Sequence, residues 1–220
     1  GSGADLKATL PEIDQFKITV DSGATDLRLE LFVSSEKSGQ HSDGWLNEVA
    51  REFNQAGVRL ADGRRVGMAI RKIASGTGYQ YIASGKYLPD GFSPSNHLWV
   101  EMARAHGVTM TPIRDRLVGN TAGVVLRTEV AERLRAQYGA LDIPNIINAV
   151  VQGDLVMGYT NPFASSTGLN FLVTVLAEFS KGRSDEFLSD AVASAFESFQ
   201  RGVPFVALTT LQMRESVQNE

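Results

Sequence analysis

Short apolar runs alternate with amphipathic stretches along most of this chain. Runs rich in β-branched residues, such as 27–33 and 64–73, are typical of strands, whereas the apolar spacing of 45–56 is typical of a helix. In that helix Trp45, Val49 and Phe53 fall on one face, and Gly57 suits the residue after the last turn. Strands separated by helices in this way predict parallel sheets with helices on both faces, an α/β fold.

The alternation continues to the end of the chain, with caps and prolines marking the helix starts. Further strands are expected over 108–113, 122–127, 155–160 and 203–208. Further helices are expected around 79–82 and over 169–180. Others are expected to begin at a Ser93 cap with Pro94 in the first turn, at Thr128, at Asp142, at Ser184 and at Thr209-Thr210.

Three of the predicted strands lead into small turns rich in hydroxyl groups. These turns are Ser34-Ser35, Ser75-Gly76-Thr77 and Ser165-Ser166-Thr167. In open parallel sheets, ligands bind outside the carboxyl ends of the strands, where helix N-termini gather. A single turn of this kind is usually only a helix cap. Three at equivalent places favour a binding site, with one of Ser165 and Ser166 as a cap and the remaining hydroxyls facing a ligand.

Length and charge exclude several classes of function. A chain of 220 residues suffices for one large domain or two small lobes. Its net charge of −4, without a dense basic run, argues against binding nucleic acid or an anionic membrane surface. No apolar stretch is long enough to span a bilayer, so no direct membrane insertion is expected. The chain has no cysteine, which removes disulfides and thiol chemistry.

Known catalytic and metal-binding motifs fail at identifiable positions. Gln80 stands where a phosphate-binding loop ending in Gly85-Lys86 needs its first glycine, and Tyr87 stands where that loop needs Ser or Thr. The three histidines have no metal-ligand spacing, and no Ser–His–carboxylate arrangement is evident. We therefore predict no enzyme, no catalytic residue, no metal site and no cofactor, and a hydrolase ranks third among the functions considered.

Several segments together carry a resemblance to a known family. They are LRLELFVSSEK (27–37), VGMAIRKIASGTG (66–78), FSPSNHLWVEMA (92–103), TPIRDRLVGNTAGVVLRTEVAERL (111–134) and GDLVMGYTNPFASSTGLNFL (153–172). In this order they resemble bacterial extracellular solute-binding proteins of the type II periplasmic-binding fold. The likeness is greatest to binding domains associated with von Willebrand factor A domains. It covers about residues 27–179, and the P-x-x-S-[ST]-x-G pattern from Pro162 to Gly168 is its most specific part.

The resemblance implies two α/β lobes that enclose a ligand between them. Residues 1–112 would form the first lobe, 113–205 the second, and 206–220 a return segment or a truncated C-terminal helix. The ligand-binding residues implied are Ser34, Ser35, Ser75, Gly76 and Thr77 in the first lobe, and Asn120, Tyr159, Asn161, Ser165, Ser166 and Thr167 in the second. Asn120 is equally well explained as a turn residue before Thr121.

Two functions from different classes follow. The first is a periplasmic or extracellular module that binds a small polar or anionic solute for a membrane transporter or a sensor. Any membrane anchor would lie outside this sequence. The second is a ligand-free interaction or regulatory domain that contacts a neighbouring domain of a larger protein.

Overall fold

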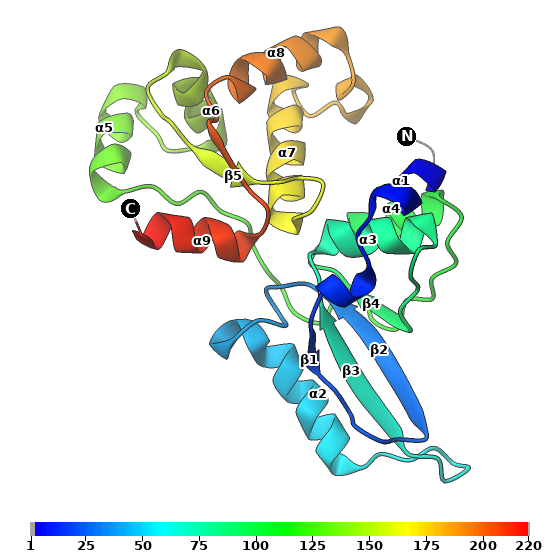
Figure 1. Ribbon diagram of the computed structural model, residues 1–220. Coiled ribbons are helices and arrows are strands. Elements are labelled where there is room, and N and C mark those ends of the chain that lie inside the picture. Colours follow the sequence, from blue (N-terminus) through cyan, green and yellow to red (C-terminus); the bar gives the residue numbers. More distant parts are fainter. Residues whose placement is uncertain (1–2, 220) are drawn as a thin grey trace.

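A computed structural model describes residues 3–219, which form two α/β halves joined by the segment 106–127 (Figure 1). The N-terminal half contains α1 (Gly3–Thr9), η1 (Ile13–Gln15), β1 (Ile18–Val20), β2 (Leu27–Val33), η2 (His41–Gly44), α2 (Trp45–Ala56), β3 (Val66–Lys72), α3 (Ser75–Ser84), β4 (Gly91–Ser93) and α4 (Leu98–Ala105). The C-terminal half contains α5 (Thr128–Tyr138), α6 (Ile143–Gln152), β5 (Gly158–Thr160), α7 (Ser166–Phe179), η3 (Ser184–Glu186), α8 (Asp190–Gln200), β6 (Phe205–Ala207) and α9 (Thr210–Asn219). The predicted α/β class is confirmed.

The sheet of the N-terminal half has the strand order β1-β3-β2-β4. β2 pairs in parallel with β3 over its whole length and with β4 at its end, whereas β1 pairs antiparallel with β3. β5 and β6 form a separate parallel pair in the C-terminal half. The prediction of parallel sheets is therefore confirmed for every pairing among the described strands except that of β1.

Helices cover both faces of the four-stranded sheet, as the alternation predicted. Successive strand residues point to opposite faces, and at the end of β2 both faces are buried. Val33 packs on the side of α2 with Val20, Ala50 and Ile70. Phe32 packs on the opposite side in a cluster with Tyr81 of α3 and Trp99 of α4. The carboxyl ends of β2 and β3 are consequently enclosed between two layers of helices.

The C-terminal half has its own apolar cluster, made mainly by helices. Buried side chains from α5, α6, α7 and α8 meet around Val150, Val175 and Phe199. Local signals set the bounds of α6: the Asp142 carboxylate accepts a hydrogen bond from Asn145 N, and Gly153 takes the left-handed conformation after the last turn. Leu169 of α7 packs instead against the cluster of the N-terminal half, so the two halves share an apolar contact.

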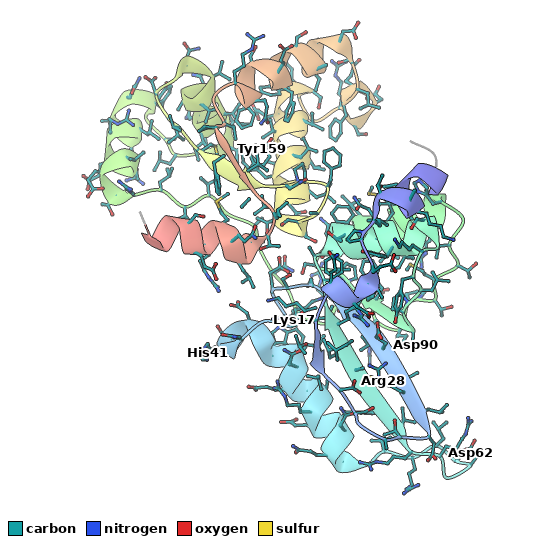
Figure 2. All side chains as sticks on the ribbon, in the orientation of Figure 1. Lys17, Arg28, His41, Asp62, Asp90 and Tyr159 are labelled. Atoms are coloured by element: carbon teal, nitrogen blue, oxygen red, sulfur yellow. The ribbon has the colours of Figure 1, made fainter. Side chains whose placement is uncertain are left out.

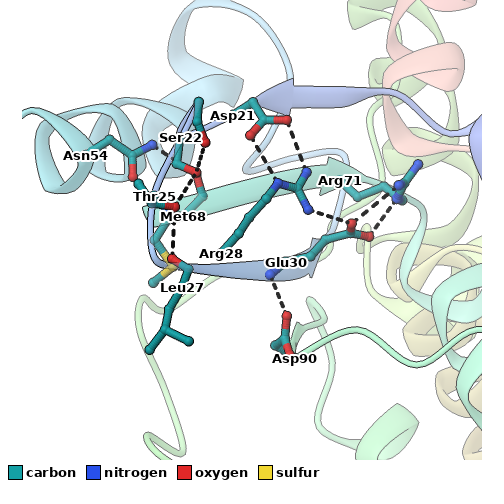
Figure 3. Close-up of polar contacts among 11 residues, drawn as sticks. Asp21, Ser22, Thr25, Leu27, Arg28, Glu30, Asn54, Met68, Arg71 and Asp90 are labelled. Carbon is teal, nitrogen blue, oxygen red and sulfur yellow. Dashed lines mark hydrogen bonds and ion pairs between the residues drawn. The ribbon is translucent and has the colours of Figure 1, made fainter. Parts of the chain in front are cut away.

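A buried ion pair ties β2 to β3 (Figure 3). The Arg71 guanidinium donates to Glu30 Oε1 at 2.8 Å, and both side chains are about nine-tenths buried. Arg28 connects Glu30 to the more exposed Asp21, and Asp90 accepts the Glu30 backbone N–H at 2.8 Å. Burial raises the pKa of Glu30, but hydrogen bonds from Arg71, Tyr87 and Arg28 outweigh it and hold this pKa below its ordinary value.

The strands predicted over 108–113 and 122–127 are wrong. Both segments lie in the irregular connection between the halves and pair with no strand among residues 3–219. Four of their side chains are partly buried against helix clusters: Val108 and Met110 pack on the N-terminal cluster, Val124 and Leu126 on the C-terminal one. β propensity depends on the packing available, and here side-chain packing replaces strand pairing.

Three details of the predicted helices are also wrong. Ser93 caps no helix, because its backbone belongs to β4 beside Val33, and α4 begins five residues later. Ser184 begins only the short η3, whereas α8 is capped by the Ser189 hydroxyl. On α2, Val49 is half exposed, and the face toward the sheet carries Asn47 and Ala50.

Candidate functional site: a hydroxyl cluster where the halves meet

Two of the predicted hydroxyl turns lie side by side in the N-terminal half. Because β2 and β3 are parallel and in register up to Val33 and Lys72, their carboxyl ends meet at one edge of the sheet. Ser34 and Ser35 follow β2 directly, and Ser75 begins α3 two residues after Ile73. All three serines are buried. The topology therefore places these turns together, as expected for a ligand site at a strand edge.

The loop after β4 joins these turns. The Ser95 hydroxyl shares a 2.6 Å hydrogen bond with the Ser34 hydroxyl, and the backbone N–H of Ser95 donates to Ser75 Oγ at 3.1 Å. The same hydroxyl donates to the Glu36 carboxylate at 3.3 Å. Ser95 was not among the predicted site residues. A three-residue strand gives almost no periodic signal, so the Ser93-Pro94-Ser95 turn did not appear to follow a strand.

A buried lysine, Lys37, forms hydrogen bonds with this loop. The Lys37 ammonium donates to Ser93 O at 2.9 Å, to Ser93 Oγ at 2.8 Å and to Pro94 O at 3.1 Å. Lys37 is only 8% exposed. Burial lowers its pKa to about 8, because desolvation disfavours the charged form, while the nearby Glu36 carboxylate opposes the shift. Sequence reasoning missed this residue, since a lysine after a strand is usually solvated.

The third turn belongs to the C-terminal half and contacts the Ser75-Gly76-Thr77 turn and Trp99 of α4 across the junction. Gly76 N donates to Ala164 O at 2.8 Å, and the buried Trp99 Nε1 donates to Ser166 Oγ at 2.9 Å. Asn96 and Asn170 also bond each other across the junction. A Cβ on Gly76 would lie 2.2 Å from Phe163 O, so only glycine permits this approach. The two halves are thus in direct hydrogen-bonded contact at the hydroxyl turns.

The helix-cap interpretation of Ser165 and Ser166 is wrong. Ser165 occupies the N-cap position of α7, but its side chain makes no capping hydrogen bond. Its hydroxyl lies 3.4 Å from Thr210 Oγ1, and Thr167 Oγ1 lies 2.8 Å from the same atom. Both serines are 3% exposed. Their hydroxyls are therefore used for tertiary contacts instead of the local cap.

One buried hydroxyl near this turn has no hydrogen-bond partner. Thr160 Oγ1, at the end of β5, is the buried side-chain polar atom left without a partner among the described residues. Its backbone carbonyl lies so close to α7 that a Cβ on Gly168 would come within 2.0 Å of it. An unpaired buried hydroxyl costs about 1–3 kcal/mol of stability.

The remaining predicted site residues differ in their surroundings, and not all of them lie at this cluster. Thr77 is half-buried on the first turn of α3. Asn161 shapes the turn, since its Oδ1 accepts from Phe163 N at 2.8 Å. Tyr159 lies within the C-terminal half (Figure 2), where its hydroxyl bonds Gln200 and its ring packs on Phe171. Asn120 is exposed in the connecting segment and takes no part in the hydrogen bonds described for the other site residues.

Other kinds of site find little support in the described part of the chain. No group of three or more His, Asp or Glu side chains there is placed to hold a metal ion. None of the described helices is both long and apolar enough to cross a membrane. Two surface hollows lie elsewhere, one between β6 and α9 and one on α8 around Phe196. The hydroxyl cluster remains the site to which both halves contribute.

Comparisons with known proteins give no information about the function of this chain, so its interpretation rests on the residues described above. A scan against protein-family models, a search of curated proteins and a search of solved structures each found no significant match to this chain. What is established is an α/β protein with a hydroxyl cluster buried where its halves meet.

The Trp99–Ser166 bond provides a direct test of the junction. Trp99→Phe removes the indole N–H while keeping an aromatic ring, and Ser166→Ala removes the acceptor. We expect a coupling energy of about 1 kcal/mol in the double-mutant cycle, because each single variant leaves the other buried group unpaired. Urea unfolding of the four proteins measures it. Additive effects of the two substitutions would show that the bond contributes nothing to stability.

Proposed function

We propose that this chain is an extracytoplasmic solute-binding module of the type II periplasmic-binding kind. It binds a small polar or anionic solute between its two halves, for a transporter or a sensor. The observation that carries the proposal is that two buried hydroxyl-rich turns of one half are linked through Ser95, and that the third turn, from the other half, bonds Gly76 and Trp99 beside them. Ser34, Ser75 and Ser166 belong to this hydroxyl cluster, and the binding itself involves no catalysis, metal or cofactor.

The chemistry of the cluster supports a polar solute. Ser34, Ser75, Ser165 and Ser166 supply neutral hydroxyls, and the N-termini of α3 and α7 add backbone N–H groups and the positive ends of two helix dipoles. In the described arrangement two hydrogen bonds at these turns cross the junction, from Gly76 N to Ala164 O and from Trp99 Nε1 to Ser166 Oγ. A solute therefore replaces such bonds when it binds, instead of filling a separate cavity.

Solute binding requires the halves to move apart and close again. The direct bonds that oppose opening are few among the described residues: Gly76 N to Ala164 O, Trp99 to Ser166, Asn96 to Asn170, and the exposed Arg214–Asp43 ion pair at 2.6 Å. Each such bond contributes about 1 kcal/mol. The irregular segment 106–127 is the connection about which such a hinge motion takes place.

Binding is tested by thermal unfolding of the purified chain with a panel of oxyanions, amino acids, organic acids, sugars and divalent metals. A solute at 100 times its dissociation constant adds about 2.7 kcal/mol to stability, which corresponds to a rise of roughly 5–10 °C in Tm for a chain of this size. A flat panel for a protein that unfolds cooperatively would contradict solute binding.

The double variant Ser165→Ala/Ser166→Ala tests the site assignment. We expect it to lose about 1–3 kcal/mol of binding free energy for each buried hydrogen bond removed, which abolishes the shift in Tm. Ser180→Ala is the matched control, because Ser180 is equally buried at the other end of α7 and bonds only Ala177 O and its neighbours. Unchanged affinity in the double variant would show that the site lies elsewhere.

A second function, an interaction domain without a small solute, is favoured by one observation. The connecting segment 106–127 presents four large apolar side chains to solvent: Ile113, Leu117, Val118 and Val125. Apolar residues gathered on a surface often mark a protein contact. A partner that binds the Ser165→Ala/Ser166→Ala variant as well as the wild type, but not a variant with these four residues made polar, would favour this function over solute binding.

A further inference from the structure

The outer edge of β6 has no neighbouring strand among residues 3–219. β6 pairs in parallel with β5 on one side only, and these two strands form a sheet of their own. A sheet edge presents backbone N–H and C=O groups to which a further strand can bind, and native proteins usually block such edges with a helix, a charge or a proline. The groups that lie along this edge therefore decide whether it accepts another strand.

The pairing with β5 identifies the backbone groups at the outer edge. Asn161 N donates to Ala207 O at 2.6 Å, so the backbone groups of Ala207 point toward β5. Along a strand, the N–H and C=O of one residue point to one side and those of the next residue to the other, so the groups of Val206 point away from β5. The next N–H on this side, that of Leu208, donates to Gln212 Oε1 at 3.0 Å. This side-chain oxygen stands where the carbonyl of an added strand would accept.

A surface hollow follows this edge. It is lined by four consecutive residues, 205–208, and by Gln212, Glu215 and Ser216 of α9. Side chains of successive strand residues point to opposite faces, so a hollow that reaches all four residues runs along the edge of the strand and not over one of its faces. Its volume of about 420 Å³ is many times the ~30 Å³ of a water molecule, so side chains can enter it.

The position of α9 distinguishes the two faces of the strand. A Cβ on Gly158 of β5 would lie 3.4 Å from Met213 Cε, so Gly158 faces α9. Gly158 pairs with Phe205, and paired residues of neighbouring strands share a face. Phe205 and Ala207 therefore lie on the face toward α9, whereas Val206 lies on the opposite face.

The two faces offer different chemistry to an added strand. On the side of α9, Glu215 is the one charged residue among those that line the hollow, and its neighbour Arg214 is already bonded to Asp43. On the other side, Val206 and Leu208 expose apolar side chains. A strand in which apolar and basic residues alternate matches both faces at once. The net charge of −4 on the whole chain adds a long-range attraction for such a segment.

We infer that the outer edge of β6 is a docking site for an extended segment of a partner protein in which apolar and basic residues alternate. The segment becomes the third strand of the sheet. Its backbone bonds Val206, its apolar residues pack beside Val206 and Leu208, and a basic residue reaches Glu215. In strand addition the backbone bonds provide affinity and the alternate side chains provide specificity. The site uses no residue of the hydroxyl cluster, so it does not rest on solute binding.

The experiment is fluorescence anisotropy of three labelled octapeptides with the purified chain at physiological ionic strength. Valine and lysine alternate in the first peptide, and valine and glutamate alternate in the second. The third has the composition of the first, with its valines and lysines in separate blocks. We expect the first to bind and the second to bind about 5-fold more weakly or not at all, because it loses the ion pair with Glu215. The block peptide keeps the charge but cannot match both faces, so it should not bind.

A change of charge in the hollow tests the specificity. Glu215→Lys should reverse the preference, so that the valine–glutamate peptide binds more tightly than the valine–lysine peptide. Glu132→Lys is the matched control, because it makes the same change of charge at an exposed position of α5 outside the hollow. The control should keep the preference of the wild type.

A change of the backbone tests strand addition itself. Val206→Pro removes the N–H at the outer edge and none of the bonds to β5, so it should abolish binding of the valine–lysine peptide. Val206→Thr keeps the N–H and the branched side chain and should bind as the wild type does. Hydrogen exchange of the wild type measured by NMR keeps the test independent of the folding of the proline variant. The valine–lysine peptide should slow exchange of the Val206 amide, and the block peptide should not.

Several results would overturn the inference. They are equal affinity for the lysine and glutamate peptides, an unchanged Val206 amide in the bound wild type, and no binding of any of the three peptides. Sedimentation equilibrium tests the other possible occupant. A wild type that dimerises, with a Val206→Pro variant that folds and stays monomeric, would place a second copy of the chain at this edge and also overturn the inference. Solute binding is tested separately by the thermal panel, so either proposal can fail alone.

Discussion

Glu30→Gln should lower the free energy of unfolding by about 3–5 kcal/mol, the cost of leaving one member of a buried ion pair without its partner. The substitution keeps the shape of the side chain but leaves the buried Arg71 guanidinium without its carboxylate. Arg71 also donates to Ile13 O and Phe16 O, so η1 and the approach to β1 should loosen with it. Urea unfolding followed by circular dichroism measures the loss.

Asp62→Asn is the matched control for this prediction. It breaks the Arg64–Asp62 ion pair at 2.8 Å, in which both side chains are about half exposed. Exposed ion pairs contribute only about 0–1 kcal/mol. If the free energy of unfolding falls as little in Glu30→Gln as in Asp62→Asn, the buried ion pair does not contribute the expected stability.

The same pair makes the wild type sensitive to acid. The pKa of folded Glu30 is lowered from its ordinary value of 4.5, so its contribution to stability is present above that value and is lost as pH falls through the folded pKa. Glu30→Gln lacks this titration. The stability difference between the two proteins should therefore narrow below about pH 4.5.

Gly76→Ala should destabilise the contact between the halves by about 3 kcal/mol, at the upper end of the range for overpacking. The new Cβ would lie 2.2 Å from Phe163 O and 2.7 Å from the Trp99 ring. A backbone oxygen cannot rotate away, so the turn at 163–166 must move and the Gly76 N–Ala164 O bond breaks. We expect lower stability, a larger radius of gyration by small-angle X-ray scattering, and loss of solute binding.

Gly78→Ala, two residues along the same helix, separates the clash from helix propensity. A Cβ there would meet only side-chain carbon atoms of Phe92, Phe32 and Ile73, at 3.2–3.4 Å. Both substitutions gain about 1 kcal/mol of helix propensity. Gly78→Ala should therefore be nearly neutral. Equal behaviour of the two variants would mean that the close approach of the halves at Gly76 does not contribute to stability.

Features encoded within a few residues were predictable from the sequence. The strand at 27–33, the helix after Trp45 with Gly57 in the left-handed conformation, and the Asp142 cap are examples. Each depends on side-chain spacing or on a hydrogen bond within one turn. The α/β class follows from the order of such elements. The placing of the Ser34 and Ser75 turns at one sheet edge follows from the parallel pairing that this class implies.

The function of each hydroxyl was decided only by contacts between distant parts of the chain. Ser34 and Ser95 lie 61 positions apart, and Trp99 and Ser166 lie 67 apart. A serine before an apolar run has the same local pattern whether it caps its helix or bonds the other half, so Ser166 was misinterpreted. Lys37 is likewise a buried donor only because β4 returns beside β2. The sequence by itself determined the elements and their class, because those depend on local geometry. Tertiary packing determined which polar groups are buried together, because burial depends on the whole fold.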